Sequence, residues 1–435
     1  MVSTPRARRA LRLLVIAGLM PAWSTAAQHP APTPSTFERS TTSVLHASPE
    51  LARALRQVWQ RSPALQAAES RLAAGHAREQ AAGQPLYNPE IEIGAENADV
   101  DTRSIGISQT LDWSGKRHAR TDIAASETRA AEAQLEQQRQ RIGLDWLAAF
   151  ASFRVASERV ELGAQRVGLL ERFAVLAQRR FNVGDIAQLE RDLAELALQE
   201  AHAQQAELVA EQAKARQSIV AIGGGDTGLP DLPRALPPAA ELSPATSVEM
   251  LPSLREAAAD VAAARARVVA AERERRPDPT LSLVGGRVSN GPLSDKVIGL
   301  NLRIPLFVRN SHGAEVAAAL ASVDEADALL RDGRQRASAQ IEQAATGYNA
   351  LRAAWLAWQH SRAANASDRA ALLQRLWEAG EIGTTDYLVQ LKQSLDTELT
   401  ATGLRARAWQ AFADWLAASG GLDRWLGDTA EAAQP

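Results

Sequence analysis

The feature that most limits the fold is a short turn that occurs twice. It reads FNVGDI at residues 181–186 and WEAGEI at residues 377–382, so each copy has an aromatic residue, a glycine three positions later, an acid and an isoleucine. The glycines, Gly184 and Gly380, lie 196 residues apart, and six residues after each stands a further acid, Glu190 or Asp386. Each turn joins two segments of helical periodicity, which predicts two helical hairpins.

The same spacing recurs along the chain. Matching pairs, at offsets of 189 to 196 residues, are Pro63 and Pro252, Pro89 and Pro279, Gly106 and Gly299, and Gly224 and Gly420. A repeat of this kind is typical of a duplicated structural unit. The two halves therefore share one predicted plan, which is helix, strand pair, long helix, turn and helix.

The first 27 residues have the layout of a secretory signal peptide, with arginines, an apolar run and small residues up to Ala27. The chain has no cysteine, so disulfides, thiolate metal sites and a lipid-bearing cysteine are excluded. A net charge of −3 makes nucleic acid a poor partner. Beyond residue 27, no run approaches the ~18 to 20 apolar residues that a spanning helix requires. Strands would have to carry the chain into a membrane; otherwise it is a soluble periplasmic helical protein.

The pattern predicts the following organisation. Residues 1–27 are the signal peptide, 28–47 an extended lead-in, 48–222 the first repeat, 223–245 a Gly- and Pro-rich linker, 246–427 the second repeat and 428–435 a disordered tail. In the first repeat we expect strands at 89–97 and 104–111, a long helix at 116–180 and the turn at 181–190. In the second we expect strands at 279–288 and 296–306, a long helix at 314–377 and the turn at 378–386. Each long helix would extend for roughly 95 Å.

The four expected strands alternate apolar and polar residues with a period of two. In the first strand, Ile91, Ile93 and Ala95 alternate with three acids, namely Glu90, Glu92 and Glu96. If the apolar side faces lipid, the acids face the lumen of a barrel and favour cations. The alternative is an ordinary wetted strand face that Arg303 partly neutralises.

Four strands cannot form a membrane barrel in one chain, because open sheet edges leave backbone groups unpaired in lipid. Two chains would supply eight strands and three would supply twelve. Trp113 and Phe307, just after the second strand of each half, fit an interfacial aromatic girdle, and Lys116, Arg117 and Arg309 fit the headgroup zone beyond it. A small soluble hairpin domain packed on helices is the alternative for these strands.

The strand exits SQTLDWSGKR and LRIPLFVRN and the turns FNVGDIAQLE and WEAGEIGTTDYL resemble the TolC-type outer-membrane efflux proteins over essentially the whole mature chain. The continuation LVQLKQSLDTEL and the ending WQAFADWLAASGGLDRWLG are similar to the branch that serves cobalt–zinc–cadmium resistance pumps. The resemblance implies a mainly helical homotrimer, with a twelve-stranded barrel in outer-membrane lipid and a helical tunnel across the periplasm. It also implies two partners, a periplasmic adaptor and a proton-driven RND-type pump.

The resemblance gives the turns a role at the closed periplasmic end of the tunnel, where the adaptor docks. The docking residues it implies are Phe181, Gly184, Asp185, Trp377, Gly380 and Glu381. Asp386, and secondarily Glu190, would ring the pore. Many relatives place another acid three residues further on, whereas this chain has Val389 there and Leu193 in the first half, which puts a two-ring gate in doubt. Helix capping alone would also account for the glycines and both acids.

Catalytic motifs are absent, so we expect no enzyme and no cofactor. The seven histidines are scattered, with no two spaced as i and i+4, which argues against a built metal site. The resemblance implies an export duct, most simply for divalent heavy-metal cations in a tripartite efflux system. A duct for drugs or other small molecules and a soluble periplasmic coiled-coil scaffold are the alternatives.

Overall fold

The computed structural model describes residues 46–225, 228–241, 248–362 and 366–427. The predicted signal peptide and tail, and residues 28–45 of the lead-in, lie outside these ranges. All described residues belong to one compact unit, Val44–Pro435.

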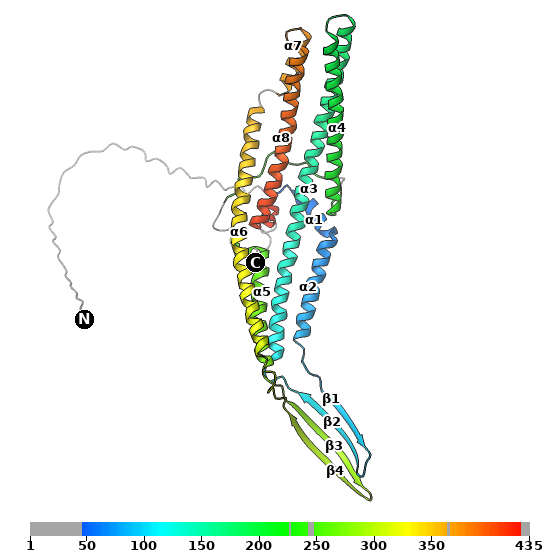
Figure 1. Cartoon of the computed structure of the whole chain (residues 1–435), viewed down its shortest axis with the longest axis vertical. Helices are drawn as coiled ribbons and strands as arrows, with labels where there is room; N and C mark the ends of the chain where they lie inside the picture. The colour runs from blue at the N-terminus through cyan, green and yellow to red at the C-terminus, as the bar shows by residue number, and fades with distance from the viewer. Residues whose placement is uncertain (1–45, 226–227, 242–247, 363–365, 428–435) are drawn as a thin grey trace, which may run out of the picture. The chain divides into compact units, whose positions relative to one another are not determined.

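The first half consists of four helices and one strand pair (Figure 1). The helices are α1 Pro49–Arg61, α2 Pro63–Ala82, α3 Lys116–Asn182 and α4 Gln188–Ala221. Ser48 and Ser62 cap α1 and α2 through their hydroxyl groups, and a proline occupies the first helical position of each. No proline interrupts the 67 residues of α3, which contacts α2, α4, α5 and α8. Helix α3 therefore packs against helices of both halves, whereas α6 and α7 pack against α8.

The second half repeats this plan with changes. It contains the short 3₁₀ helix η1 Val248–Met250 and the helices α5 Pro252–Glu274, α6 Gly313–Arg362, α7 Ala366–Glu378, α8 Thr384–Ser419 and α9 Leu422–Leu426. The long helix expected at 314–377 is thus represented by α6 and α7, and residues 363–365 between them lie outside the described residues.

The strands form a single antiparallel sheet in the order β1-β2-β3-β4. Their bounds are β1 Glu90–Glu96, β2 Asp101–Thr110, β3 Thr280–Asn290 and β4 Leu293–Arg303. The sequence predicts two hairpins; in the structure β2 also pairs with β3 along ten residue pairs, so the two halves share one sheet. Strands β1 and β4 remain as open edges.

Aromatic residues from distant parts of the chain form the main core. Trp146 and Phe150 of α3 lie with Tyr348 of α6 and with Trp409 and Phe412 of α8 in one buried cluster. A second cluster lies where the helical hairpins end and includes Leu170, Phe173, Trp377, Tyr387 and Leu391. The sheet lies at the opposite end of α3 from these hairpin ends (Figure 1). Among the helices that the structure describes, none combines the length and apolarity needed to cross a membrane.

Candidate functional site

One face of the sheet is apolar and exposed. The strand register places Ile91 beside Ile107, Ile107 beside Leu283 and Leu283 beside Leu300 in one row across all four strands. The exposed aliphatic residues on this face are Ile91, Ile93, Ile105, Ile107, Leu281, Leu283, Ile298, Leu300 and Leu302. Their exposed fractions run from 43% to 82%. Such a continuous apolar surface requires lipid or another apolar partner to cover it.

The other face is polar and carries the acids predicted to line a lumen. Glu90 lies beside Ser108, Ser108 beside Ser282 and Ser282 beside Asn301. Glu92 and Glu96 share this face, because side chains two residues apart on a strand point the same way. Arg303 is on the far edge strand, separated from the strand of Glu90 by two others, and makes no ion pair with any residue described in this chain. Neutralisation of the acids by Arg303 within one chain is therefore not observed.

Asp112 fixes the start of α3 just after the sheet ends. Its carboxylate accepts hydrogen bonds from the backbone N–H groups of Lys116 at 2.7 Å and Arg117 at 2.8 Å. Partial burial opposes ionisation, but these donors and the Lys116 charge hold the pKa of the Asp112 carboxyl below its ordinary value. Gly115, with φ of 75°, allows the chain to turn between the carboxylate and the N–H groups that it caps.

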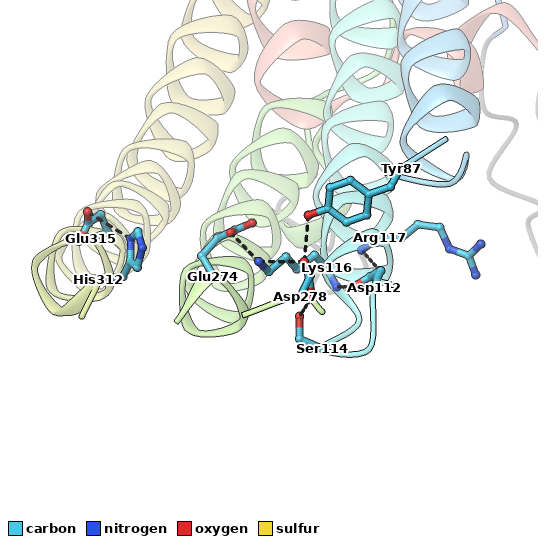
Figure 2. A network of polar contacts seen from close by, with 9 residues as sticks. All are labelled: Tyr87, Asp112, Ser114, Lys116, Arg117, Glu274, Asp278, His312 and Glu315. Atoms are coloured by element: carbon cyan, nitrogen blue, oxygen red, sulfur yellow. Dashed lines mark hydrogen bonds and ion pairs between the residues drawn. The ribbon is translucent and has the colours of Figure 1, made fainter. Parts of the chain in front are cut away.

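Lys116 joins the two halves through a buried polar cluster (Figure 2). Its Nζ lies 3.0 Å from Glu274 Oε2 and 3.1 Å from Asp278 Oδ2. Asp278 also accepts hydrogen bonds from the hydroxyl groups of Tyr87 at 2.9 Å and Ser114 at 3.2 Å. The sequence placed Lys116 in the lipid headgroup zone; this is corrected, because the residue is only 7% exposed and its charge is used inside the protein.

The electrostatics of this cluster follow from its burial and pairing. Burial lowers the pKa of the Lys116 amine, but Glu274 and Asp278 outweigh it and raise that pKa above its ordinary value. Burial and the hydrogen bond to Asp278 raise the pKa of the Tyr87 hydroxyl. At neutral pH the lysine is therefore charged and the tyrosine is a donor, as the cluster requires.

The matching junction in the second half is more exposed to solvent than the cluster around Lys116. His312, at the start of α6, has a φ of 54°, and its Nδ1 lies 3.5 Å from the exposed Glu315 carboxylate. Phe307 packs edge-on against the His312 ring with 5.2 Å between ring centroids. Trp113, the other predicted girdle residue, is 69% exposed. Both aromatic residues thus lie next to the end of the sheet, and at least Trp113 presents its ring to the surroundings.

The two hairpin turns have the same backbone. Gly184 and Gly380 have φ values of 77° and 74°, and each N–H donates to the carbonyl of the aromatic residue three positions earlier, Phe181 or Trp377. A side chain at this φ is strained, which explains both glycines. Arg180 connects the turns: its guanidinium contacts the Asp185 carboxylate, donates to the Trp377 carbonyl at 3.2 Å and lies over the Trp377 ring.

The structure separates the predicted docking residues into two groups. Gly184, Asp185, Gly380 and Glu381 are exposed, and Phe181 is half-buried. Trp377 is 2% exposed and donates from its ring nitrogen to Thr384 Oγ1 at 3.1 Å. Its ring stacks on Tyr387 and packs at a tilt against Phe173. Trp377 therefore holds the turns together from inside.

The two predicted ring acids also differ. The Glu190 carboxylate accepts the backbone N–H of Ala187 at 3.1 Å, as a helix-capping group does. Asp386 is exposed in the first turn of α8, and its carboxylate has no hydrogen bond or ion pair to any other residue in the described ranges. Glu190 is thus committed to capping, whereas Asp386 offers an unpaired carboxylate.

The buried cluster around Lys116 was not predicted from the sequence. A signal was present, since Tyr87-Asn88-Pro89 and Asp278-Pro279 occupy matching places and differ by one charge. Among the residues that can be described, no group of three or more His, Asp or Glu side chains could hold a metal ion.

A family model described as outer membrane efflux protein matches residues 54–225 and 247–421. The chain belongs to this family.

Three curated relatives match part of the chain. The cobalt-zinc-cadmium resistance protein CzcC of Cupriavidus metallidurans is 30% identical over 234 residues, which cover 52% of this chain and 56% of that protein. The nickel-cobalt-cadmium resistance protein NccC of Alcaligenes xylosoxydans is 25% identical over 294 residues, covering 64% and 66%. Protein CyaE of Bordetella pertussis is 29% identical over 324 residues, covering 67% of each. The first two matches span less than two thirds of the relative's length.

Solved outer-membrane channels have the same fold. A structure of CusC aligns with a TM-score of 0.73 at 14% identity, covering 91% of this chain and 98% of that one. The Campylobacter jejuni CmeC outer membrane channel aligns with a TM-score of 0.72 at 15% identity, covering 92% and 94%. The predicted fold class, a duplicated and mainly helical protomer with a small membrane sheet, is confirmed.

Membership of the outer membrane efflux family places the chain in the outer membrane. A soluble periplasmic scaffold is thereby set aside. Proteins of this family are transport ducts rather than enzymes, as the sequence predicts.

Proposed function

We propose that this chain is the outer-membrane exit duct of a tripartite, proton-driven efflux system that exports divalent metal cations. The observation that carries the proposal is the two-faced sheet with open edges. Its exposed aliphatic face suits lipid, its polar face suits water, and β1 and β4 each leave a row of unpaired backbone groups. Such edges are untenable in lipid, so further copies must pair with them.

Three copies supply twelve strands, an even number within the range of outer-membrane barrels. The polar faces then line one lumen, which α3 and its partners continue into the periplasm. A soluble single chain would leave the aliphatic face in water. The periplasmic adaptor and an RND-type pump complete the path at the exposed hairpin turns.

Substitutions on adjacent residues of β4 test the barrel directly. Leu300→Arg, on the lipid face near the middle of the strand, is expected to cost about 2–4 kcal/mol per chain. Asn301→Arg, on the lumen face, should be mild and serves as the matched control. Trimer yield and heat-modifiable migration in the outer-membrane fraction are the measurements; equal assembly of both variants contradicts the assigned faces.

Two observations support divalent metal cations as cargo. Two relatives are named for resistance to cobalt, cadmium and zinc or nickel. The lumen face carries Glu90, Glu92 and Glu96, so a trimer would present nine carboxylates to the pore, a field that attracts cations. The name of CyaE contains no metal, and a duct for other small molecules is the second candidate.

The cargo is tested in a strain that lacks the gene, complemented with wild type or a Glu90→Gln, Glu92→Gln, Glu96→Gln variant. We expect deletion to sensitise cells to cobalt, zinc or cadmium more than to drugs. The reconstituted triple variant should lose cation preference relative to anions. Sensitivity to drugs alone would replace metal export by the second candidate, and an unchanged permeability ratio would remove the role of the acids.

A further inference from the structure

Three basic residues form one row across the sheet, on the same face as the aliphatic residues. Arg103 of β2 lies directly beside Arg287 of β3, and Arg287 lies directly beside Lys296 of β4. Each stands two residues from the aliphatic row that contains Ile105 and Ile298, so all three share the apolar face. All three side chains are exposed.

This basic row is unfavourable within the protein itself. Side chains directly opposite one another on neighbouring strands have Cβ atoms about 4.5–5.5 Å apart, and like charges at that distance repel. Across the part of the chain that the structure describes, none of the three makes an ion pair. The fourth position of the row, Ala95 of β1, is neutral, and the next row outward contributes one acid, Asp101, with Ser289 and Ser294. The three positive charges of the row are therefore available to bind an anion from outside the chain.

The row marks the outer boundary of the apolar face. Along β4 and the segment after it, the exposed alternation Leu306, Ile304, Leu302, Leu300, Ile298 ends at Lys296. From Ile298 to Leu306 there are eight residue steps, which at strand spacing span roughly 27 Å, comparable to the ~25 Å apolar band of outer-membrane barrels before strand tilt is considered. The helices leave the sheet at its periplasmic end, so the row lies at the opposite end, by the hairpin loops and the outer leaflet (Figure 1).

We infer that Arg103, Arg287 and Lys296 bind the phosphate groups of anionic lipids in the outer leaflet. This site rests on the placement of the sheet in the outer membrane as proposed above. Arginine offers paired donors to a phosphate, and lysine adds a mobile point charge. Their aliphatic stems can lie along the apolar face while the charged ends reach the headgroups. A phosphate group that lies between two neighbouring basic side chains attracts both and offsets their mutual repulsion.

The two ends of the sheet differ in how their cations are used. At the periplasmic end, Lys116 is buried and paired with Glu274 and Asp278 inside the protein. At the outer end, the basic row has no such internal partner. Because Lys116 is already paired within the protein whereas the basic row has no partner in the described chain, we place the anionic lipid in the outer leaflet.

The test uses purified full-length trimers and diphosphorylated lipid A as the probe. Trimers are equilibrated in phosphatidylcholine nanodiscs containing lipid A, dephosphorylated lipid A or neither, and retained lipid is counted by native mass spectrometry. We expect wild type to retain lipid A at least fivefold more than its dephosphorylated form. Arg103→Gln, Arg287→Gln, Lys296→Gln should abolish that preference, whereas Arg103→Lys, Arg287→Lys should keep most of it.

Arg303→Gln is the matched control, because it removes a cation from the lumen face and should leave lipid retention unchanged. Retention by wild type should also fall as salt rises, since these contacts are exposed to solvent. Equal retention of both lipid forms by wild type would overturn the site, and so would retention that does not change with salt concentration. Both measurements use wild type only, so they remain decisive even if the triple variant does not fold. Displacement of lipid A by millimolar inorganic phosphate would overturn the lipid assignment and show that the row binds a free anion instead. Trimer yield and conductance, recorded on the same samples, report separately on the proposed duct.

Discussion

The two strand-to-helix junctions descend from one plan yet differ in chemistry (Figure 2). In the first half, Asp112 caps α3, and Lys116 is buried with carboxylates from the second half. In the second half, the matching positions are Leu306 and Asn310, and an exposed His312–Glu315 pair begins α6. Duplication thus preserved the order of elements, while only one copy acquired the polar cluster that ties the halves together.

The hairpin turns show the same division on a smaller scale. Their backbones share the same three hydrogen bonds around the glycine, but Trp377 is buried whereas Phe181 is half-buried. Glu190 is used as a helix cap, and Asp386 is not. Backbone geometry was therefore kept in both halves, and side-chain roles were distributed between them.

Removing the buried lysine should have the largest effect on this contrast. Lys116→Ala leaves Asp278 buried without its cation, and we expect a loss of about 3 kcal/mol, at the low end for a broken buried pair because Glu274 is half-exposed. The matched change in the second half, Asn310→Ala, should cost less than about 1 kcal/mol because its site is exposed. Thermal midpoints from circular dichroism of the purified protein measure both. Equal losses would show that the two junctions contribute alike.

Substituting valine for each turn glycine tests the positive φ that the two turns share. Gly184→Val and Gly380→Val should each cost about 1–2 kcal/mol, because L-residues are disfavoured at positive φ. An added Cβ meets no atom within 4 Å at either site, so backbone strain is the only local cost. Crosslinking to the adaptor should fall for both variants while the barrel still inserts. Undiminished crosslinking would move the adaptor contact elsewhere on the molecule.

Loss of the α3 cap should have a smaller effect that depends on pH. Asp112→Ala is expected to cost about 1 kcal/mol at pH 7, because two N–H groups lose their acceptor. The folded-state pKa of Asp112 lies below its unfolded value of about 3.9. Its contribution is therefore complete above that value and is lost as pH falls through the folded-state pKa.

The difference in thermal midpoint between wild type and Asp112→Ala should consequently shrink below about pH 4. Leu306→Ala, the matched control, should show no such dependence. A difference that stays constant from pH 7 to pH 3 would mean that the carboxylate charge does not stabilise the helix start.

The smallest stability change is expected at the two turn acids, where function should differ most. Asp386→Asn should leave stability within about 0.5 kcal/mol, because the carboxylate has no partner in the described chain. If Asp386 rings the pore, the variant should relieve block of conductance by divalent cations without lowering trimer yield. Glu190→Gln, which alters a cap, should leave the block unchanged. Equal block in wild type and both variants would assign the gate to other residues.

The sequence alone determined the parts of this protein that depend on local pattern. A period of two located four strands and their apolar and polar faces, and proline-free helical stretches located the long helices. The repeated turn predicted the left-handed glycines, because that backbone conformation excludes most other residues. These properties involve neighbours in the chain, so the sequence shows them without any knowledge of distant contacts.

Tertiary structure decided what depends on partners far apart in the sequence. The pairing of β2 with β3 is what joins the halves in one sheet, and only that register brings Arg103 beside Arg287. Lys116 is buried because Asp278, more than 160 residues away, offers it a carboxylate. Burial and charge pairing are long-range properties, since the same residue is stable inside or outside depending on what the fold places next to it.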